Sequence, residues 1–266
     1  MNNYQTETIF SLPSELLLLF FLIFMGGIYW SVNKRVGFQV LYLTIFSMTI
    51  AHIITLHFPY FYSNDELVPF THPNIQALMT FFAFFIPLAR HRRDVVLCLM
   101  PPAIISILLV ILTATPIFSI VGGLLIGGFI VFTFYRTLEW VGGMPEFYLL
   151  VSSMLLPLFL AAILYPVELY LLYPGVLLGT GIGVTLETLK TKFNIQRNPP
   201  QKRFLAFFIG SAGLFIFYGT DQLIKTWIPL PDMTLGLVLG LWITFILPVL
   251  LQLFKVYDSQ MNSREL

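Results

Sequence analysis

Long apolar runs dominate this sequence and decide what it can fold into. Each run approaches the roughly 20 residues that a helix needs to cross the hydrocarbon core of a bilayer. In lipid only helices and closed barrels satisfy their own backbone polar groups, and these runs lack the alternation of barrel strands. The sequence therefore predicts an all-α, polytopic transmembrane helical bundle of about nine spans. The runs lie near residues 14–32, 38–57, 74–89, 95–113, 117–135, 147–165, 168–187, 204–223 and 234–254.

Composition supports lipid as the solvent of this chain. Of its 266 residues, 58% are hydrophobic and only 10% are charged, whereas a soluble domain carries roughly 25% charged residues. The net charge of +1 and the lack of a basic stripe give no reason to expect nucleic acid as a partner. The single cysteine, Cys98, lies inside an apolar run, so neither a disulfide nor a zinc framework is expected. The first 13 residues lack the basic region of a cleaved signal peptide, so the first run is expected to remain as a span.

The placement of positive charge predicts an orientation. Cytoplasmic loops of membrane proteins accumulate Lys and Arg. With nine spans and the N-terminus outside, all but one of the 14 basic residues fall in cytoplasmic segments, the exception being Lys225. We therefore expect an external N-terminus and a cytoplasmic C-terminus. The residues in agreement are Lys34, Arg35, Arg90, Arg92, Arg93, Arg136, Lys190, Lys192, Arg197, Lys202, Arg203, Lys255 and Arg264.

Small and aromatic residues indicate how the spans pack. Glycines let helix backbones approach closely in a membrane, so glycine clusters predict tight helix contacts. Tyr29, Trp30, Trp140 and Trp227 lie at span ends, where aromatic residues serve as interfacial anchors. The glycine clusters are Gly122, Gly123, Gly127 and Gly128; Gly179, Gly181 and Gly183; and Gly210 with Gly213.

Ionisable residues inside a membrane are functional candidates by default, and this chain has few. The polar residues expected near its outer face are His52, His57, His72, Asp65 and Glu66. His52 and His57 are five apart, roughly 140° out of register on a helix, so a metal site is not expected. No Asp or Glu lies in mid-span, which argues against a proton-coupled transporter. The sequence also lacks a hydrolase GxSxG and a phosphate-binding GxxxxGK[ST] motif.

Several segments resemble one known family. Residues 29–37, Tyr-Trp-Ser-Val-Asn-Lys-Arg-Val-Gly, are similar to the opening of bacterial membrane phosphatases of the type 2 phosphatidic acid phosphatase (PAP2) superfamily. The resemblance continues through Phe58-Pro59-Tyr60, 73–77 (Pro-Asn-Ile-Gln-Ala) and 121–127 (Val-Gly-Gly-Leu-Leu-Ile-Gly). Residues 175–183, 202–205 and 240–245 look like the C-terminal extension of one PAP2 branch. The likeness covers roughly 14–255.

This resemblance implies an organisation and a location. A PAP2-like membrane core would occupy residues 1–140, and C-terminal membrane helices would occupy 141–266. The membrane implied is the bacterial cytoplasmic (inner) membrane.

The catalytic motifs of the family are altered in this chain. The family relies on K-x6-RP, PSGH and SR-x5-H-x3-D, whose histidine attacks phosphorus while Lys and Arg hold the phosphate oxygens. Between Asp94 and Tyr135 the sequence has neither histidine nor arginine. Without a nucleophile or an anion clamp, the family mechanism cannot run, so no catalytic residue is expected. The altered positions are Ala51 for the lysine, Phe58-Pro59 for RP, Pro73-Asn74-Ile75-Gln76 for PSGH, Leu109 for the second arginine, Thr115 for the nucleophile and Ser119 for the aspartate.

Three functional hypotheses follow. The first is a catalytically inactive PAP2-like membrane protein, without cofactor or metal, that binds a membrane lipid or a membrane protein partner. The second is a lipid or isoprenoid phosphate phosphatase whose altered site uses the histidines and carboxylates of the outer face. The third is a lipid transporter or flippase, against which the lack of inverted-repeat symmetry in the hydropathy pattern argues.

Overall fold

The structure is a computed structural model of the chain. Several sequence-based expectations concern residues that it does not describe, namely Pro59, Asp65, Lys192, Arg197, Lys225, Trp227 and Arg264. For Glu66, Arg136 and Trp140 it describes the backbone but not the side chain. The described residues are 14–58, 61–63, 66–113, 115–141, 146–165, 167–191, 195, 198–219 and 230–257.

The helices of the described chain follow the nine predicted runs closely. Six of them are long and apolar enough to cross a membrane, and three shorter apolar helices accompany them. This confirms the all-α, multi-pass architecture. The first five runs become α1 (Ser14–Gly27) with the π-helical η1 (Ile28–Val32), α2 (Lys34–His57), α3 (Pro73–Ala83) with the 3-10 turn η2 (Ile86–Leu88), α4 (Arg92–Thr113) and α5 (Ile117–Val141).

The second half is built in the same way. Two of its spans contain a π-helical segment, in which each backbone hydrogen bond spans five residues instead of the four of an α-helix. The elements are α6 (Glu146–Leu164); η3 (Glu168–Leu171), α7 (Leu172–Leu186) and the π-helical η4 (Glu187–Thr191); α8 (Pro200–Gly219); and α10 (Pro231–Leu241), the π-helical η5 (Trp242–Ile246) and α11 (Leu247–Leu253).

Local sequence signals explain where individual helices begin. The side chain of Asn33 accepts hydrogen bonds from the backbone N–H groups of Arg35 (2.9 Å) and Val36 (3.3 Å), which caps α2. Proline begins α3 at Pro73 and α10 at Pro231, where its missing N–H has no helical partner to lose. The long loop after α2 holds a short antiparallel hairpin of β1 (Phe61–Ser63) and β2 (Glu66–Val68), which the sequence analysis did not predict.

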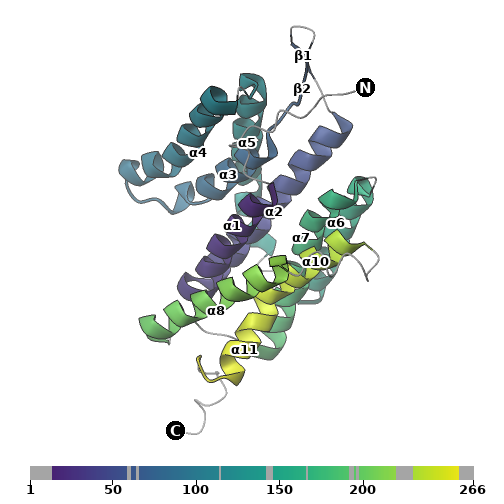
Figure 1. The fold of residues 1–266 in the computed structure, drawn as a ribbon. Coiled ribbons are helices and arrows are strands. Elements are labelled where there is room, and N and C mark those ends of the chain that lie inside the picture. The colour runs from purple at the N-terminus through teal and green to yellow at the C-terminus, as the bar shows by residue number, and fades with distance from the viewer. Residues whose placement is uncertain are drawn as a thin grey trace.

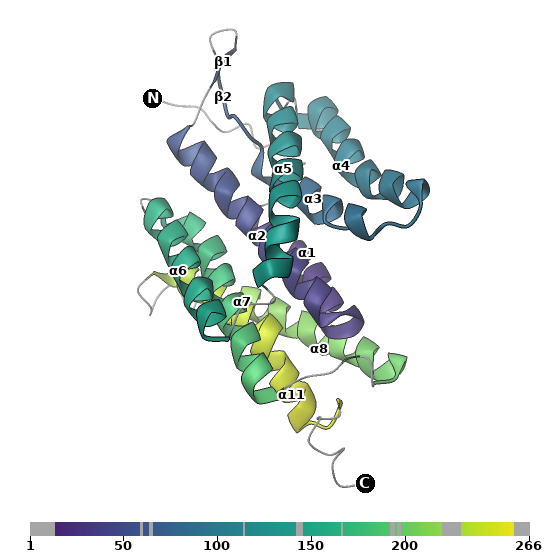
Figure 2. The ribbon, with the colours of Figure 1, turned by 180° about the vertical axis from the view of Figure 1, so that it is seen from behind.

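Helix α2 lies at the centre of the bundle. It packs against α1, α3, α5, α6 and α7, and both ribbon views show α1 and α2 between the α3–α5 group and the α6–α11 group (Figures 1 and 2). Helix α4 lies at the periphery, with only 11% of its most apolar window buried. The protein core therefore surrounds α2, while α4 presents its apolar side chains outward, as a lipid-facing helix does.

The predicted glycine contacts are confirmed. A methyl group on Gly179 would lie 2.2 Å from the carbonyl oxygen of Leu237, and one on Gly240 would lie 2.5 Å from that of Val176. These positions bring α7 and α10 into backbone contact. Gly210 and Gly213 of α8 make room for the rings of Trp30 and Trp242 in the same way.

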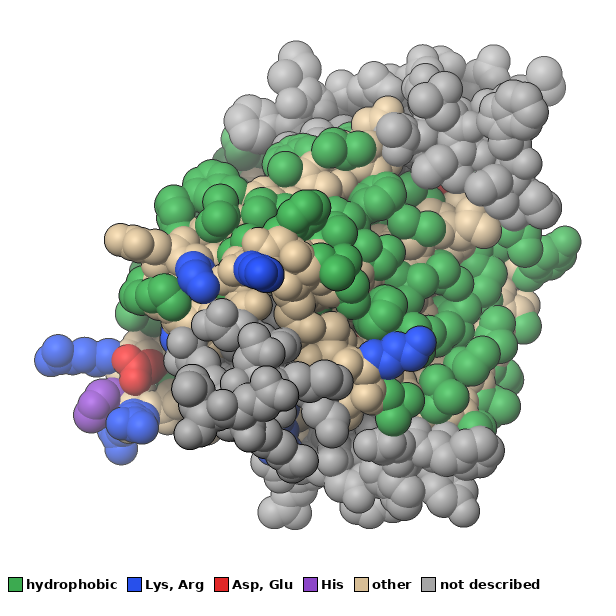
Figure 3. Space-filling view, turned by 90° about the horizontal axis from the view of Figure 1, so that it is seen from below, with side chains coloured by type: hydrophobic (Ala, Val, Ile, Leu, Met, Phe, Trp, Pro, Cys, Tyr) green, Lys and Arg blue, Asp and Glu red, His purple; other side chains and the backbone are tan. Residues whose placement is uncertain are grey.

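Basic residues from distant parts of the chain meet at one end of the bundle, which we call the basic end. Lys34 at the start of α2 pairs with Glu187 at 2.7 Å, and Arg203 at the start of α8 accepts a hydrogen bond at its backbone carbonyl from Ser31. Figure 3 shows Lys and Arg side chains on the face that contains this end. The gathering agrees with the predicted pattern of charges, and the side of the membrane that it faces stays a prediction.

The expectation that Tyr29 and Trp30 anchor the bundle at the membrane surface is wrong. Both side chains are completely buried. The indole of Trp30 donates to the carbonyl of Ile243 at 2.7 Å, and the hydroxyl of Tyr29 donates to that of Thr244 at 3.2 Å. Their polar atoms therefore bond to the C-terminal helices instead of to water or lipid headgroups.

Candidate functional site

Gln76, which the family resemblance aligns with the histidine of PSGH, is the centre of a buried polar cluster. The amide of Gln76 in α3 donates to the carbonyl (2.9 Å) and the hydroxyl (3.3 Å) of Ser47 in α2. The hydroxyl of Thr71 donates to the side-chain oxygen of Gln76 at 2.8 Å, and that of Thr80 donates to the hydroxyl of Ser47 at 2.7 Å. All four side chains are completely buried. They form a closed set in which each polar group is directed at another part of the protein.

The residues that the family resemblance aligns with the last motif are also bonded internally. Ser119, at the start of α5, donates its hydroxyl to the carbonyl of Pro69, and its own carbonyl accepts the backbone N–H of His72 at 3.1 Å. The hydroxyls of Thr113 and Thr115 share a hydrogen bond. Leu109 is half-buried in α4. The side chains of Leu109, Thr113, Thr115 and Ser119 carry neither a charge nor a group that titrates near neutral pH.

Glycines of α5 let its backbone approach α3 and the residues just before α3. A methyl group on Gly122 would lie 2.2 Å from the carbonyl oxygen of Phe70, and one on Gly127 would lie 2.6 Å from that of Gln76. Such close approach of α5 leaves the α2–α3–α5 junction filled by backbone. Gly128, one residue further along, has only an ordinary contact of 3.5 Å with the end of the Met79 side chain.

His52 lies deep in the bundle, next to Ala51 at the position of the family's lysine. Its imidazole is stacked between two tyrosines, with ring centroids 4.3 Å from Tyr170 and 4.5 Å from Tyr173. Neither ring nitrogen has a hydrogen-bond partner among the described residues. Ala51 itself is completely buried. Ala51 therefore offers no charged group at this point, and the imidazole of His52 lies enclosed between two aromatic rings.

The other candidate residues of this region do not assemble into a reactive group in the part of the chain that the structure describes. His57 ends α2 and is exposed, whereas His72 precedes α3 and is half-buried. Burial lowers the pKa of His72 below its ordinary value, so its imidazole is neutral at pH 7. No set of three His, Cys, Asp or Glu side chains able to hold a metal occurs among the described residues. Phe58 is exposed, Asn74 is half-buried, and Pro73 is the first residue of α3.

The segment 29–37, which carries the first part of the family resemblance, has a clear structural role at the basic end. The backbone carbonyl of Trp30 accepts a hydrogen bond from the hydroxyl of Tyr257 at 3.0 Å. A methyl group on Gly37 would lie 2.4 Å from the Cα of Tyr29, so only glycine fits where α2 turns back past η1. We call this assembly, in which residues 29–37 meet α8, η4 and η5, the basic-end joint.

Sequence reasoning missed the basic-end joint, although parts of it leave a signal. The opposite charges of Lys34 and Glu187 lie at neighbouring helix ends, a pairing that a charge-placement argument can find. The π-helical segments have no comparable signal in the sequence. They shift backbone carbonyls such as those of Ile243 and Thr244 out of the regular pattern, and the side chains of Trp30 and Tyr29 satisfy these carbonyls.

A comparison with family models finds one match. Residues 171–259 match a family described as "PAP2 superfamily phosphatase, transmembrane extension". No curated protein and no solved structure matches the chain. The matched residues include η4, α8 and η5, which are the elements that meet segment 29–37 at the basic-end joint.

Proposed function

We propose, from the premise that the chain is a PAP2 superfamily member carrying the C-terminal transmembrane extension, that it is a non-catalytic member of that superfamily. Its helical scaffold is that of a phosphatase-related membrane protein, and its role is to bind a membrane lipid or a membrane protein partner. The motif positions taken from the family resemblance are part of this proposal.

One observation carries the proposal: Gln76 occupies the position of a catalytic histidine and is fully engaged inside the protein. Its amide donates to Ser47 and its side-chain oxygen accepts from Thr71. An amide does not titrate, so it cannot protonate a leaving oxygen as an imidazole can. The neutral Ala51, Thr115 and Ser119 at the other motif positions give no nucleophile and no cationic clamp, whereas phosphoryl transfer depends on both.

The test is phosphate release by the purified protein in detergent or nanodiscs. Phosphatidic acid and an isoprenoid pyrophosphate serve as substrates, and vanadate serves as the inhibitor of a phosphohistidine mechanism. We expect no vanadate-sensitive release above that of an identically purified, unrelated membrane protein.

Two variants make this result interpretable. If wild-type protein releases phosphate, and His52→Ala or His72→Ala abolishes the release without changing the melting temperature, the chain is an enzyme with altered chemistry and the proposal is wrong. Phosphate release that persists after both substitutions is assigned to a contaminant only if the Gln76→Leu protein and the unrelated control protein release phosphate as well.

The binding role is tested separately by what stays with the protein after extraction. Helix α4 offers a long apolar face outside the bundle, with Leu97, Ile107 and Ile111 all exposed. Extraction in polymer nanodiscs followed by mass spectrometry should recover a stoichiometric lipid or one recurrent membrane protein. Recovery of bulk membrane lipid in its bulk proportions, with no recurrent protein, contradicts the binding role.

A further inference from the structure

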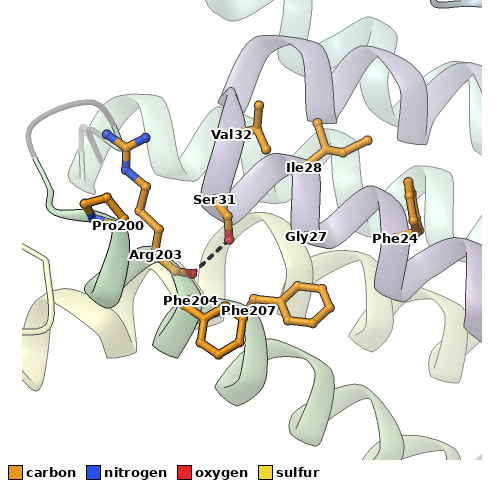
Figure 4. Close-up of a pocket in the computed structure, with 9 residues that line it drawn as sticks. All are labelled: Phe24, Gly27, Ile28, Ser31, Val32, Pro200, Arg203, Phe204 and Phe207. Carbon is orange, nitrogen blue, oxygen red and sulfur yellow. Dashed lines mark hydrogen bonds between the residues drawn. The ribbon is translucent and has the colours of Figure 1, made fainter.

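A groove at the basic end lies between α1 with η1 on one side and α8 on the other. It has a volume of about 540 Å³, within the range of roughly 300–1,000 Å³ that small-molecule sites occupy. Phe24, Gly27 and Ile28 line one wall, and Phe204 and Phe207 line the other (Figure 4). The groove is therefore apolar along most of its length.

The polar groups of the groove are gathered at one end of it. Ser31 and Arg203 are the two lining residues with polar side chains, and the hydroxyl of Ser31 donates to the carbonyl of Arg203 at 2.9 Å. Figure 4 shows the Arg203 side chain extending past Pro200, with its guanidinium at the rim. The Nε of Arg203 donates to the carbonyl of Asn198 at 2.9 Å, which holds the side chain in this direction.

The groove opens toward lipid. Phe24 is 51% exposed, Val32 is 64% exposed and Phe204 is 66% exposed, which in water would be an unfavourable surface but in a bilayer faces acyl chains. The groove wall on α8 runs from Pro200 to Phe207, roughly 10 Å at 1.5 Å per residue. Its polar rim lies at the first turn of α8, the end of a candidate span, where the headgroup region of a bilayer is expected to begin.

We infer that this groove binds one anionic phospholipid of the membrane, with the phosphate at the Arg203 rim and the upper part of an acyl chain along the phenylalanine walls. A guanidinium matches the planar oxygens of a phosphate, and the neighbouring Lys202 adds positive charge at the same level. The apolar walls match an acyl chain better than a polar peptide or a free phosphate, because a polar ligand placed against the phenylalanines would lose its hydrogen bonds.

This site is separate from the altered family motifs. Helix α2 spans the bundle from Lys34, beside the groove, to His57, roughly 36 Å away at 1.5 Å per residue. Ser47, which bonds to Gln76, lies 13 residues beyond Lys34 on the same helix, roughly 20 Å at 1.5 Å per residue, so the groove is separate from the buried cluster around Gln76. The inference does not depend on whether the chain is catalytic.

Native mass spectrometry of the purified protein tests the inference. Delipidated protein is titrated with phosphatidylglycerol or with phosphatidylcholine of the same acyl chains. We expect one phosphatidylglycerol per chain to be retained about fivefold more tightly than phosphatidylcholine, the effect of one basic group close to a lipid phosphate.

Three substitutions locate the binding. Arg203→Gln should remove the preference for phosphatidylglycerol, whereas Arg203→Lys should retain most of it. Val32→Trp places a large ring at the open mouth of the groove and should reduce retention of both lipids. Arg93→Gln, which removes an exposed charge at the start of α4, is the matched control and should leave retention unchanged.

The outcomes separate cleanly. Equal retention of the two lipids by wild-type protein overturns the inference. So does a phosphatidylglycerol preference that is the same in Arg203→Gln, Arg93→Gln and wild type. A circular dichroism melt of each variant shows that a lost preference comes from a folded protein. If Arg203→Gln unfolds, Val32→Trp decides the question, because unchanged lipid retention by that variant would overturn the inference.

Discussion

Two regions beside α2 are held in contrasting ways. Near the altered motifs, polar bonds join parts of the N-terminal half, such as Gln76 to Ser47 and Ser119 to Pro69. At the basic-end joint, the bonds connect opposite ends of the chain: Trp30 to Ile243 and Tyr257 to Trp30, separations of 213 and 227 residues. The first region joins helices at the positions that the resemblance aligns with catalytic motifs, and the second region ties the N-terminal helices to the C-terminal ones.

The contrast teaches that resemblance to a family can be retained for packing as well as for chemistry. Residues 29–37 and the glycines of α5 are similar to family segments, and in the structure they make helix contacts. The motif positions that would carry charge hold neutral side chains. We therefore expect substitutions at the basic-end joint to lower stability most and substitutions at the altered motifs to lower it less.

The largest effect is expected for Trp30→Ala. The ring fills the space beside Gly210 and its indole bonds to Ile243, so its removal leaves a cavity and an unsatisfied carbonyl in the core. The free energy of unfolding should fall by about 3–5 kcal/mol. Thermal unfolding in detergent measures this change. Trp30→Phe, which keeps an aromatic ring, should lose less than half as much, and equal losses for the two variants would contradict the role of the ring in filling this space.

A smaller effect is expected when the ion pair of the basic-end joint is broken. Lys34→Met leaves the completely buried Glu187 without this partner. Because the Lys34 side chain is 33% exposed, the loss should be about 2 kcal/mol, below the 3–5 kcal/mol typical of deeply buried pairs. Arg35→Met removes the same charge one residue later at an exposed position and should change stability by less than about 0.5 kcal/mol. Similar melting temperatures for the two variants would show that the pair is not stabilising.

The altered-motif region is tested by a neighbouring pair of glycines. Gly127→Ala places a methyl group 2.6 Å from the carbonyl of Gln76 and should destabilise the fold by about 1 to 2 kcal/mol. Gly128→Ala meets only the end of the Met79 side chain at 3.5 Å, and alanine favours the helix, so it should be neutral or stabilising. Chemical unfolding of both variants in the same detergent gives the comparison. A Gly127→Ala protein as stable as wild type would contradict the close approach of α3 and α5.

The smallest effect at neutral pH is expected for Tyr257→Phe, about 1 kcal/mol for the lost hydrogen bond to Trp30. Burial raises the pKa of Tyr257 to about 12. Because this pKa lies above the ordinary value near 10, the neutral phenol is favoured in the folded state. Its contribution is complete below pH 10 and is lost as the pH rises toward 12.

The pH dependence has a direct control. Wild-type protein should therefore lose stability between pH 10 and pH 12 more steeply than Tyr257→Phe, measured by thermal unfolding across that range. Parallel stability profiles for the two proteins would show that the phenol is not protected by the fold.

Much of the fold could be predicted from sequence because membrane spans and small-residue contacts leave local signals. The apolar runs located the helices, and the glycines of α5, α7 and α8 located close contacts. The burial of Tyr29 and Trp30 could not be predicted in this way, since an aromatic residue at a span end has the same sequence signature whether it faces lipid or the core. The β1–β2 hairpin was missed because each of its strands is only three residues long, too short to show a recognisable alternation.

The candidate site was less accessible to sequence reasoning than the fold. The substitution of motif residues is visible in the sequence, but the closed hydrogen bonding of Gln76 depends on Ser47, 29 residues away on another helix. Likewise, the stacking of His52 between Tyr170 and Tyr173 depends on helices separated by more than 100 residues along the chain. Long-range pairs of this kind are set by helix packing, which the hydropathy pattern does not encode.

The proposal that the phosphate-binding chemistry is lost is tested most directly by vanadate binding to the purified protein, followed by vanadium NMR. Vanadate mimics the phosphate that the family's Lys, Arg and His residues hold. We predict no saturable broadening of the vanadate signal at protein concentrations up to the millimolar range, and no difference between wild type and His72→Ala. Saturable binding that His72→Ala or His52→Ala abolishes would reveal an anion site at the altered motifs and would contradict the account.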